Sequence, residues 1–277
     1  MGEGADFPID LREESVKGFM FDVDGTLAHR DSTGRALPQP GALEVLERIR
    51  SSGRRLALFT NASHIPSSRV AAGLRADGFP ISDEELLTPI DSATSYLLRE
   101  FPGEPVQLFA SEAVTDWMVE RGVKVTAGDD AKVVFVGHLH QVDLDEVERA
   151  GRSVDRGAPL LTSSYVRGYA GAGGIILSRG AMITAAVAKA GGARPQIVGK
   201  PSREAVRELS GRLGVPSRCI CVIGDDHRMD IALGNMGRSK TILVRSGISG
   251  DTPISEMTAR QRPDVAIDAV AELLPYL

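Results

Sequence analysis

Two aspartates near the start of the chain are spaced for nucleophilic chemistry. Asp22 and Asp24 directly follow a short apolar run, and one residue separates them. Side chains two positions apart at a strand end can turn to the same side, and Gly25 would let the chain bend away. An ionised carboxylate can attack phosphorus, while a neighbouring carboxyl group protonates the leaving oxygen and later activates water. The pair therefore indicates a phosphoryl-transfer site.

Three further apolar runs are each followed directly by polar side chains that could complete such a site. One run precedes Thr60 and Asn61, which can donate hydrogen bonds to phosphate oxygens, and another precedes Lys200, which adds a positive charge. The last run precedes an acidic segment that includes Asp225 and Asp230. Carboxylates gathered in one place repel one another and a phosphate, so the set requires a hard cation, for which Mg²⁺ is suited. Phosphoryl transfer needs mainly positioning and charge stabilisation, which these groups supply.

The chain alternates between short apolar runs and stretches with helical spacing. We expect strands at Gly18–Phe21, Leu56–Phe59, Val106–Phe109, Val133–Val136, Ile197–Val198, Cys219–Ile223 and Thr241–Val244. We expect helices at Gly41–Arg50, Ser67–Ala76, Asp143–Asp155, Arg203–Leu213 and Arg228–Gly234. This alternation predicts an α/β protein with parallel strands. Because chemistry in such sheets collects beyond the carboxyl ends of the strands, we expect the four polar endings to share one edge.

The four polar segments, taken in order, resemble the motifs of the haloacid dehalogenase (HAD) superfamily. They read Asp22-Val-Asp-Gly-Thr-Leu27, Thr60-Asn61, Gly199-Lys200-Pro201, and Gly224-Asp225 with Asp230. Residues 62–199 are far more than one crossover requires, so a second compact unit must lie there. This placement resembles the class IIA phosphatases, the 4-nitrophenylphosphatase-like group with a C2-type cap. The resemblance implies a doubly wound parallel sheet with a Rossmann-like HAD core at residues 1–90 and 193–277, and an inserted α/β cap at 91–192.

The resemblance also implies roles for individual acids. Asp22 would be the nucleophile and Asp24 the general acid and base. Mg²⁺ would be held by the Asp22 carboxylate, the Asp24 backbone carbonyl and Asp225. Asp230 would orient water beside the metal from a second shell, and Asp226 is a rival for that outer role.

The same resemblance assigns the phosphate contacts. Thr60 and Asn61 would bind the transferring phosphoryl group, and Lys200 would bridge this group and Asp22. The sequence departs from the group's usual pattern at Ala62, and at Thr162–Tyr165 in the part of the cap expected to face substrate. Substrate identity therefore cannot be copied from a relative. The polar segment 28–39 is longer than expected and reads as a surface excursion beside the site.

Several side chains near these motifs keep open roles. His138 and His140 follow a strand; a substrate-facing loop suits them better than a metal site, because no third ligand is evident. His227 lies within the fourth motif. Tyr165, Arg167 and Tyr169 are candidate substrate contacts in the cap, Arg167 for an anionic substrate. The sequence does not fix any of these roles.

The predicted reaction is Mg²⁺-dependent hydrolysis of a small phosphorylated metabolite through phospho-Asp22. A phosphotransferase or mutase on the same scaffold, or a non-catalytic metabolite-binding protein, is the alternative. A dehalogenase is disfavoured, because carbon–halogen displacement needs no acid at Asp24. The resemblance favours a homodimer.

Composition limits the expected binding partners and cellular location of the protein. The 277 residues carry 32 Lys and Arg against 37 Asp and Glu, a net charge of −5. This balance gives no electrostatic reason to expect nucleic-acid or membrane-surface binding. Neither a membrane-spanning run nor a secretory signal is evident, so we expect a cytoplasmic protein. Cys219 and Cys221 are too few for a disulfide framework, and we expect two reduced thiols.

Overall fold

The computed structural model describes residues 9, 11, 16–171 and 174–277. The chain divides into two compact units. The first comprises Met1–Thr60, Ala71–Leu87 and Leu209–Leu277, and the second comprises Asn61–Val70 and Thr88–Glu208.

The first unit is built on a six-stranded parallel sheet. Its order is β14-β13-β12-β1-β4-β5, and every neighbouring pair is parallel. The strands are β1 (Gly18–Phe21), β4 (Arg55–Phe59), β5 (Leu86–Leu87), β12 (Ile220–Gly224), β13 (Lys240–Val244) and β14 (Val265–Ile267). From β1 the chain proceeds to β4 and β5 on one side, and β12, β13 and β14 extend the other side. The order reverses between β1 and β12, which is where open α/β sheets place their ligands.

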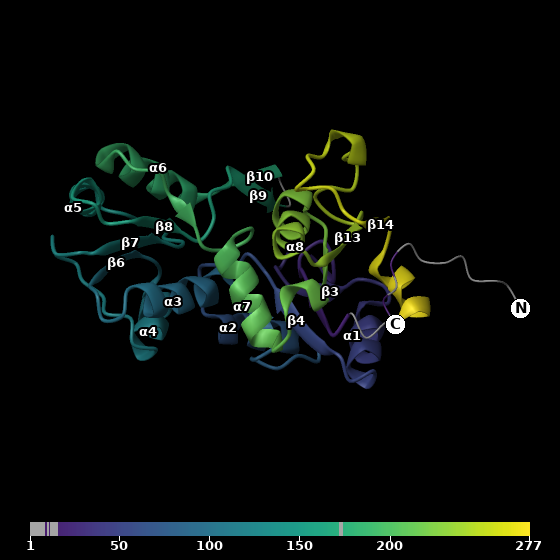
Figure 1. The fold of residues 1–277 in the computed structure, drawn as a ribbon. Helices are drawn as coiled ribbons and strands as arrows, with labels where there is room; N and C mark the ends of the chain where they lie inside the picture. Colours follow the sequence, from purple (N-terminus) through teal and green to yellow (C-terminus); the bar gives the residue numbers. More distant parts are fainter. Residues whose placement is uncertain (1–8, 10, 12–15, 172–173) are drawn as a thin grey trace, which may run out of the picture. The chain divides into compact units, whose positions relative to one another are not determined.

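Helices connect these strands. They are α1 (Ala42–Ser51), α2 (Ser67–Ala76), α7 (Arg203–Leu213) and α8 (Ala232–Gly237), and α8 directly continues a π-helical turn at His227–Ile231 (Figure 1). In α1 the apolar side chains Val45, Leu46 and Ile49 recur at helical spacing and are buried, so one stripe of the helix enters the core. The doubly wound α/β core predicted from the sequence is confirmed.

A small hairpin fills the segment that the sequence suggested as a surface excursion. Its strands, β2 (Ala28–Arg30) and β3 (Ala36–Pro38), pair antiparallel. Asp31 closes the turn, because its Oδ1 accepts hydrogen bonds from the backbone N–H groups of Thr33 and Arg35 at 2.8 and 3.0 Å. The hairpin follows Asp24 within a few residues, which places ordered backbone beside the predicted general acid.

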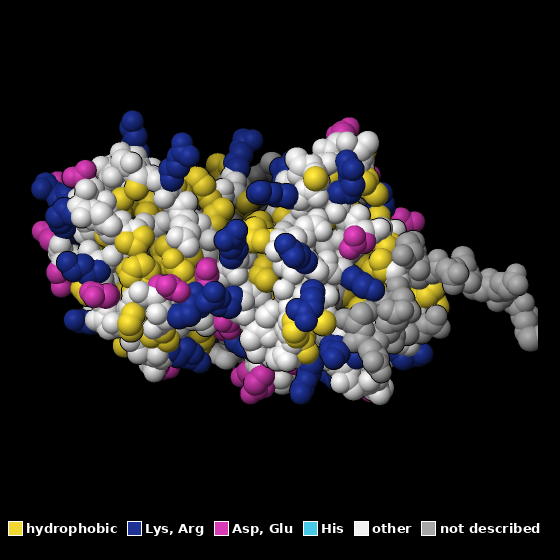
Figure 2. Space-filling view, viewed as in Figure 1, with side chains coloured by type: hydrophobic (Ala, Val, Ile, Leu, Met, Phe, Trp, Pro, Cys, Tyr) yellow, Lys and Arg dark blue, Asp and Glu magenta, His cyan; other side chains and the backbone are white. Residues whose placement is uncertain are grey.

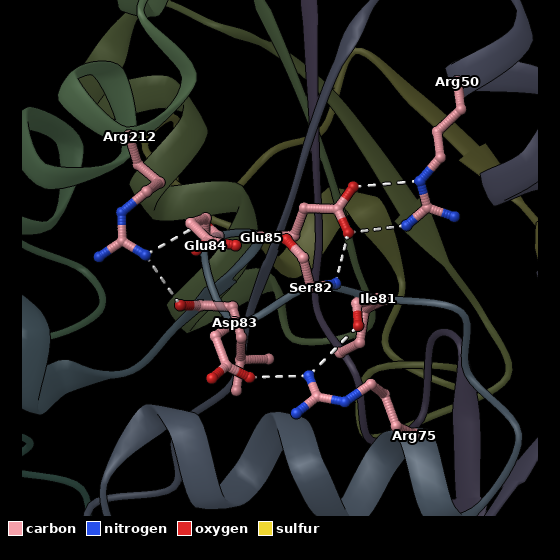
Figure 3. A network of polar contacts seen from close by, with 9 residues as sticks. Arg50, Arg75, Ile81, Ser82, Asp83, Glu84, Glu85 and Arg212 are labelled. Carbon is pink, nitrogen blue, oxygen red and sulfur yellow. Dashed lines mark hydrogen bonds and ion pairs between the residues drawn. The ribbon is translucent and has the colours of Figure 1, made fainter.

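A network of ion pairs fixes the segment that leads into β5 (Figure 3). Arg50 of α1 binds both carboxylate oxygens of Glu85, at 3.1 and 2.8 Å, and Glu85 also accepts from the Ser82 backbone N–H. Arg75 of α2 pairs with Asp83 at 2.7 Å. Arg212 of α7 donates to the backbone carbonyls of Glu84 and Leu86. Three helices thus anchor β5 at the edge of the sheet beside β4.

The second unit contains a four-stranded parallel sheet of order β11-β8-β7-β6. Its strands are β6 (Val106–Phe109), β7 (Val133–Val136), β8 (Leu160–Thr162) and β11 (Gln196–Ile197), and its helices are α3 (Pro89–Glu100), α4 (Glu112–Glu120), α5 (Leu144–Asp155) and α6 (Arg179–Gly191). A separate hairpin joins β9 (Gly168–Gly171) and β10 (Gly174–Leu177).

Both faces of this second sheet are covered. Successive strand residues point to opposite faces. Val133 and Phe135 pack with α3 and α4 in one apolar cluster, whereas Val134 and Val136 pack with α5 and α6 in another. Figure 1 shows α3 and α4 on one side of β6–β8 and α5 and α6 on the other. Because all four residues are apolar, β7 reads as a continuous hydrophobic run, which is typical of a parallel strand buried on both faces.

The structure corrects two expectations about the segment before Lys200. The predicted cap ends at residue 192, which assigns the predicted strand Ile197–Val198 to the core sheet. Instead β11 pairs with β8 of the second sheet, and the chain returns to the first unit only at Leu209. A strand of two residues carries no signal for the sheet it joins. The unit also takes residues 61–70 and 88–90, which we had placed in the core.

Charged side chains are dispersed over the face drawn in Figure 2. Lys and Arg stand singly or in small groups among acidic and hydrophobic side chains. Among the described residues, no helix has the length and apolar character needed to cross a membrane. Cys219 and Cys221 are both free thiols, and burial raises the pKa of the Cys221 thiol far above its ordinary value. Cys219 ends a short 3₁₀ turn and does not share the strand with Cys221.

Candidate active site

Three aspartates converge at the point where the strand order reverses. Asp22 follows β1 and Asp225 follows β12, and these strands are neighbours in register, Phe21 opposite Ile223. Asp230 comes from the π-helical turn that follows Asp225. One carboxylate oxygen from each aspartate lies within 4.8 Å of the other two, and the three side chains are 6%, 3% and 1% exposed. We refer to these residues as the carboxylate cluster.

A tight, hydrogen-bonded turn follows Asp22 and packs against Asp225. The Val23 carbonyl accepts from the backbone N–H groups of Leu27 and Ala28, both at 2.9 Å, and the Gly25 N–H donates to the Ala28 carbonyl at 2.7 Å. Gly25 has φ +93°, a conformation that costs glycine little. The turn carries Thr26 inward, where its hydroxyl donates to Asp225 Oδ1 at 3.4 Å.

The loop after β13 holds Asp225 from the other side. The Ile248 backbone N–H donates to Asp225 Oδ2 at 2.7 Å, and the Ser249 N–H donates to the Asp225 carbonyl at 3.1 Å. The Ser246 hydroxyl donates to the Gly25 carbonyl at 2.7 Å, so this loop and the turn after Asp22 are joined. These hydrogen bonds fix the direction of the Asp225 carboxylate.

Glycines permit this close packing. A Cβ on Gly25 or on Gly247 would overlap the Asp225 carboxylate, and a Cβ on Gly224 would overlap the Asp230 side chain. No other residue could occupy these positions without moving a member of the carboxylate cluster. Backbone therefore lies against the acids where a side chain would otherwise stand.

Asp226 and Asp230, both predicted for outer positions, take different places. Asp226 caps the π-helical turn, because its Oδ1 accepts from the Arg228 N–H at 2.8 Å. The Asp226 N–H donates to Asp230 Oδ2 at 3.2 Å, which helps to orient the Asp230 carboxylate. Asp230 thus lies within the carboxylate cluster, and Asp226 faces the start of the helix. The wider π-helical turn is a local irregularity often found at functional sites.

His227 is tied to the same loop. Its Nδ1 lies 2.8 Å from the Ser249 hydroxyl, and its backbone N–H donates to that oxygen at 3.1 Å. Burial lowers the pKa of His227, and Arg228 lowers it further, whereas Asp226 acts in the opposite direction. The ring is accordingly neutral near pH 7 and links the π-helical turn to the loop that holds Asp225.

Asp24 stands apart from the carboxylate cluster. Its side chain is 45% exposed, and its two oxygens lie 2.6 and 3.5 Å from nitrogens of Arg30. Arg30 also donates to the Gly34 carbonyl at 3.0 Å, so the β2–β3 hairpin presents the guanidinium. The role of Asp24 as the acid beside Asp22 stays a prediction.

The predicted phosphate-binding residues fall in both units. Thr60 belongs to the first unit, is buried, and donates from its N–H to the Leu87 carbonyl at 3.1 Å, beside the anchored β5. Asn61 and Lys200 belong to the second unit, so their approach to the carboxylate cluster stays a prediction. Asn61 Oδ1 is buried without a hydrogen-bond partner, so this oxygen can accept a hydrogen bond from a ligand or from water.

Sequence reasoning missed the residues that orient Asp225 and Asp24. Thr26 lies within the first motif, but only the fold shows that its hydroxyl reaches Asp225 and that Ser246 reaches the Gly25 carbonyl. Ile248 contributes only its backbone, which no side-chain pattern can reveal. Arg30 lies in a polar stretch without periodicity. Tyr165 and Arg167 are exposed, and the side chain of Tyr169 lies outside the described part of the chain.

The carboxylate cluster is chemically suited to a hard divalent cation. Its ligands are oxygens, it is buried, and its acids are gathered so closely that their mutual repulsion needs a compensating charge. Asp22, Asp225 and Asp230 would hold such an ion, whose remaining positions would be filled by water and phosphate.

Comparisons with known proteins agree with this geometry. Residues 19–124 match the haloacid dehalogenase-like hydrolase family, and residues 197–273 match a second, HAD-hydrolase-like family. The ribonucleotide monophosphatase NagD of Escherichia coli K12 is 28% identical over 262 residues, covering 94% of this chain and 98% of that protein.

Solved structures share the fold across nearly the whole chain. A p-nitrophenyl phosphatase from Archaeoglobus fulgidus has a TM-score of 0.84 at 24% identity, covering 95% of this chain and 99% of that one. A glycerol phosphate phosphatase from Mycobacterium tuberculosis, solved in complex with magnesium, has a TM-score of 0.82 at 22% identity, covering 96% of this chain and 78% of that one.

Proposed function

We propose that this chain, which belongs to the haloacid dehalogenase-like hydrolases, is a Mg²⁺-dependent phosphatase that hydrolyses a small phosphomonoester through phospho-Asp22. The observation that carries the proposal is the carboxylate cluster, in which a strand-end nucleophile meets two further buried acids. The named relatives act on different phosphate compounds, so the substrate of this chain must be inferred from its own residues.

In the first step the Asp22 carboxylate attacks phosphorus. A bond forms between a carboxylate oxygen and phosphorus, and the bond between phosphorus and the alcohol oxygen breaks. Asp24 donates its proton to that oxygen, and the alcohol leaves. Mg²⁺, when bound, would neutralise the charge of the carboxylates and of the phosphoryl oxygens. Thr60, Asn61 and Lys200 would bind those oxygens.

In the second step water hydrolyses phospho-Asp22. Asp24, now ionised, accepts a proton from the water as its oxygen attacks phosphorus. The bond between phosphorus and Asp22 breaks, which releases inorganic phosphate and restores both acids. Transfer to an alcohol in place of water would make the protein a phosphotransferase, and phosphate release in the presence of added alcohols or sugars separates the two.

The first test is hydrolysis of a phosphomonoester panel by purified protein with Mg²⁺. Asp22→Asn removes the nucleophile while keeping its shape, and we expect kcat to fall by about 10³-fold or more. Asp155→Asn makes the same chemical change on an exposed face of α5 and should keep the wild-type rate. Wild-type turnover by Asp22→Asn, or no hydrolysis across the panel, would refute the proposal.

A further inference from the structure

Three of the five histidines gather in the second unit. His138 and His140 follow β7, and their ring centroids lie 4.9 Å apart. The His64 ring lies 6.0 Å from the His138 ring. We call His64, His138 and His140 the histidine cluster. It brings together residues more than seventy positions apart in the chain.

Neighbouring groups hold the cluster in place. The Ser111 hydroxyl, at the start of α4, donates to the His64 carbonyl at 2.8 Å. The Arg179 guanidinium, at the start of α6, donates to the His140 carbonyl. A Cβ on Gly180 would overlap the Gly137 carbonyl, so α6 begins directly against the loop that carries His138. The cluster therefore lies where strand β7 ends and two helices begin, and helix N-termini favour negative charge.

The charges that act on His138 are all of one sign. Burial is the largest cause of its lowered pKa, and the remaining causes are repulsion by His140, His64 and Arg179. No carboxylate is among these causes. A negative group placed among the rings would accept hydrogen bonds from imidazole and guanidinium N–H groups and relieve the repulsion.

A metal ion suits the cluster less well than an anion. Within the described residues, Asp22, Asp225 and Asp230 are the one set of three His, Cys, Asp or Glu side chains whose ligand atoms converge within 4.8 Å. The three imidazoles do not converge in this way. Arg179 beside them would also repel a cation, whereas it would attract an anion.

We propose that the histidine cluster, together with Arg179, binds an oxyanion, either a phosphate or a carboxylate group. The group can be part of the substrate or a separate anion. If the anion is part of the substrate, the inference rests on the proposed function, and the substrate is a phosphomonoester with a second acidic group. Only residues 61–63 separate His64 from Thr60, so the covalent chain keeps the two within about 14 Å.

The anion site at the histidine cluster is tested by a binding measurement that does not depend on enzyme activity. Metal-free full-length protein with labelled histidine is titrated with inorganic phosphate at constant ionic strength, and the imidazole signals are followed by NMR. We expect phosphate to raise the pKa of His138 toward its ordinary value and to saturate in the range of about 1–10 mM. His138→Gln should weaken phosphate binding by about tenfold or more.

His29, on the exposed β2 strand, provides the matched control. Its signals should not follow phosphate, and His29→Gln should bind phosphate as the wild type does. If phosphate leaves the histidine cluster unchanged, or shifts His29 equally, the proposal is wrong. A response to Zn²⁺ without a response to phosphate would also overturn it in favour of a metal site.

A kinetic comparison then separates the two sources of the anion. Phosphoglycolate carries a carboxylate that 2-hydroxyethyl phosphate lacks. If the anion is part of the substrate, His138→Gln lowers kcat/KM about tenfold for phosphoglycolate and leaves 2-hydroxyethyl phosphate unaffected. Equal effects on both, with phosphate binding seen by NMR, identify a separate anion. If neither compound is hydrolysed, the proposed function is in question while the NMR result still decides the site.

Discussion

The Asp225 carboxylate is oriented by hydrogen bonds at both of its oxygens. Thr26 donates to Oδ1 and the Ile248 N–H to Oδ2, while glycines leave room for the surrounding backbone. A carboxylate held in this way keeps lone pairs for a cation and loses little side-chain freedom when the ion binds. Its direction therefore depends on the loop after β13 as much as on Asp225 itself.

Gly247→Ala tests this dependence. The new methyl group would overlap the Asp225 carboxylate and displace it, so we expect the Mg²⁺ concentration for half-maximal activity to rise by about tenfold or more. Titration of activity with Mg²⁺ measures the change. Gly211→Ala is the matched control, since a Cβ there meets nothing within 4 Å and alanine favours the α7 helix. Equal Mg²⁺ dependence in both variants would contradict the prediction.

Asp24 is expected to act on the leaving group. Asp24→Asn should lower kcat for an alkyl phosphate by about 10²-fold, because alkoxide departure needs a proton. For 4-nitrophenyl phosphate the loss should be smaller, because nitrophenolate leaves without protonation. Stopped assays of both substrates give the ratio. A uniform loss would mean that Asp24 does not serve as the acid.

At the scale of elements, the ion pairs before β5 support the edge of the sheet beside Thr60. Glu85 is their centre, since it binds Arg50 through both oxygens and also accepts from Ser82. The side chains of Arg50 and Glu85 are 27% and 22% exposed, so solvent screens this pair less than a surface pair. We therefore expect the pair to contribute more to stability than a typical surface salt bridge does.

Glu85→Gln should lower the free energy of unfolding by about 1–2 kcal/mol, since it breaks a bidentate charged contact. Urea denaturation measures the change. Glu44→Gln removes the charge from the exposed pair of Glu44 and Arg48, which lie 3.9 Å apart, and should change stability by no more than about 0.5 kcal/mol. An equal or larger loss of unfolding free energy in Glu44→Gln than in Glu85→Gln would contradict the prediction.

The sequence predicted several elements at their observed bounds, but it predicted none of the helices α3, α4 and α6, which are 12, 9 and 13 residues long. The bounds of β1, β6, β7, α2 and α7 agree with the expected ranges. These segments have either continuous apolar runs or clear helical spacing, and tertiary contacts reinforce both signals. The expected helix Arg228–Gly234 is a π-helical turn followed by α8, and in this turn the Ile231 N–H donates to the Asp226 carbonyl five residues back.

Short elements escaped prediction. β2, β3 and β5 have two or three residues each, too few for periodicity to show, whereas the two-residue β11 (Gln196–Ile197) was predicted one residue late, at Ile197–Val198. The start of α3 could have been found, since Thr88 and Asp91 form a capping box with Pro89 at the first turn. At the site, side-chain types located the acids, but the backbone donor at Ile248 depends on the fold alone.

At the scale of the molecule, each unit has its own sheet, and the carboxylate cluster lies wholly in the first. Mg²⁺ binding should therefore stabilise the first unit directly, by about 2.7 kcal/mol at a hundredfold excess over Kd. Hydrogen exchange measured by mass spectrometry should show slower exchange in peptides containing β1, β12 and the 245–250 loop. Peptides of β6–β8 should change little.

Asp225→Asn is the control for this experiment. It removes one charged member of the carboxylate cluster, so Mg²⁺ should no longer slow exchange in the first unit. Equal protection of both sheets by Mg²⁺, or protection that survives Asp225→Asn, would show that the ion binds elsewhere.

The strand order has a consequence for biosynthesis. In the second sheet, β6, β7, β8 and β11 lie side by side in the order in which the ribosome makes them. In the first sheet, β1 must wait for β12, which is translated some two hundred residues later. The inserted unit can thus finish folding on the ribosome while the nucleophile-bearing strand β1 has its β4 neighbour but still lacks β12. Until translation nears its end, the half-made first sheet exposes an unpaired edge, which is the stage at which nascent chains are most prone to aggregate.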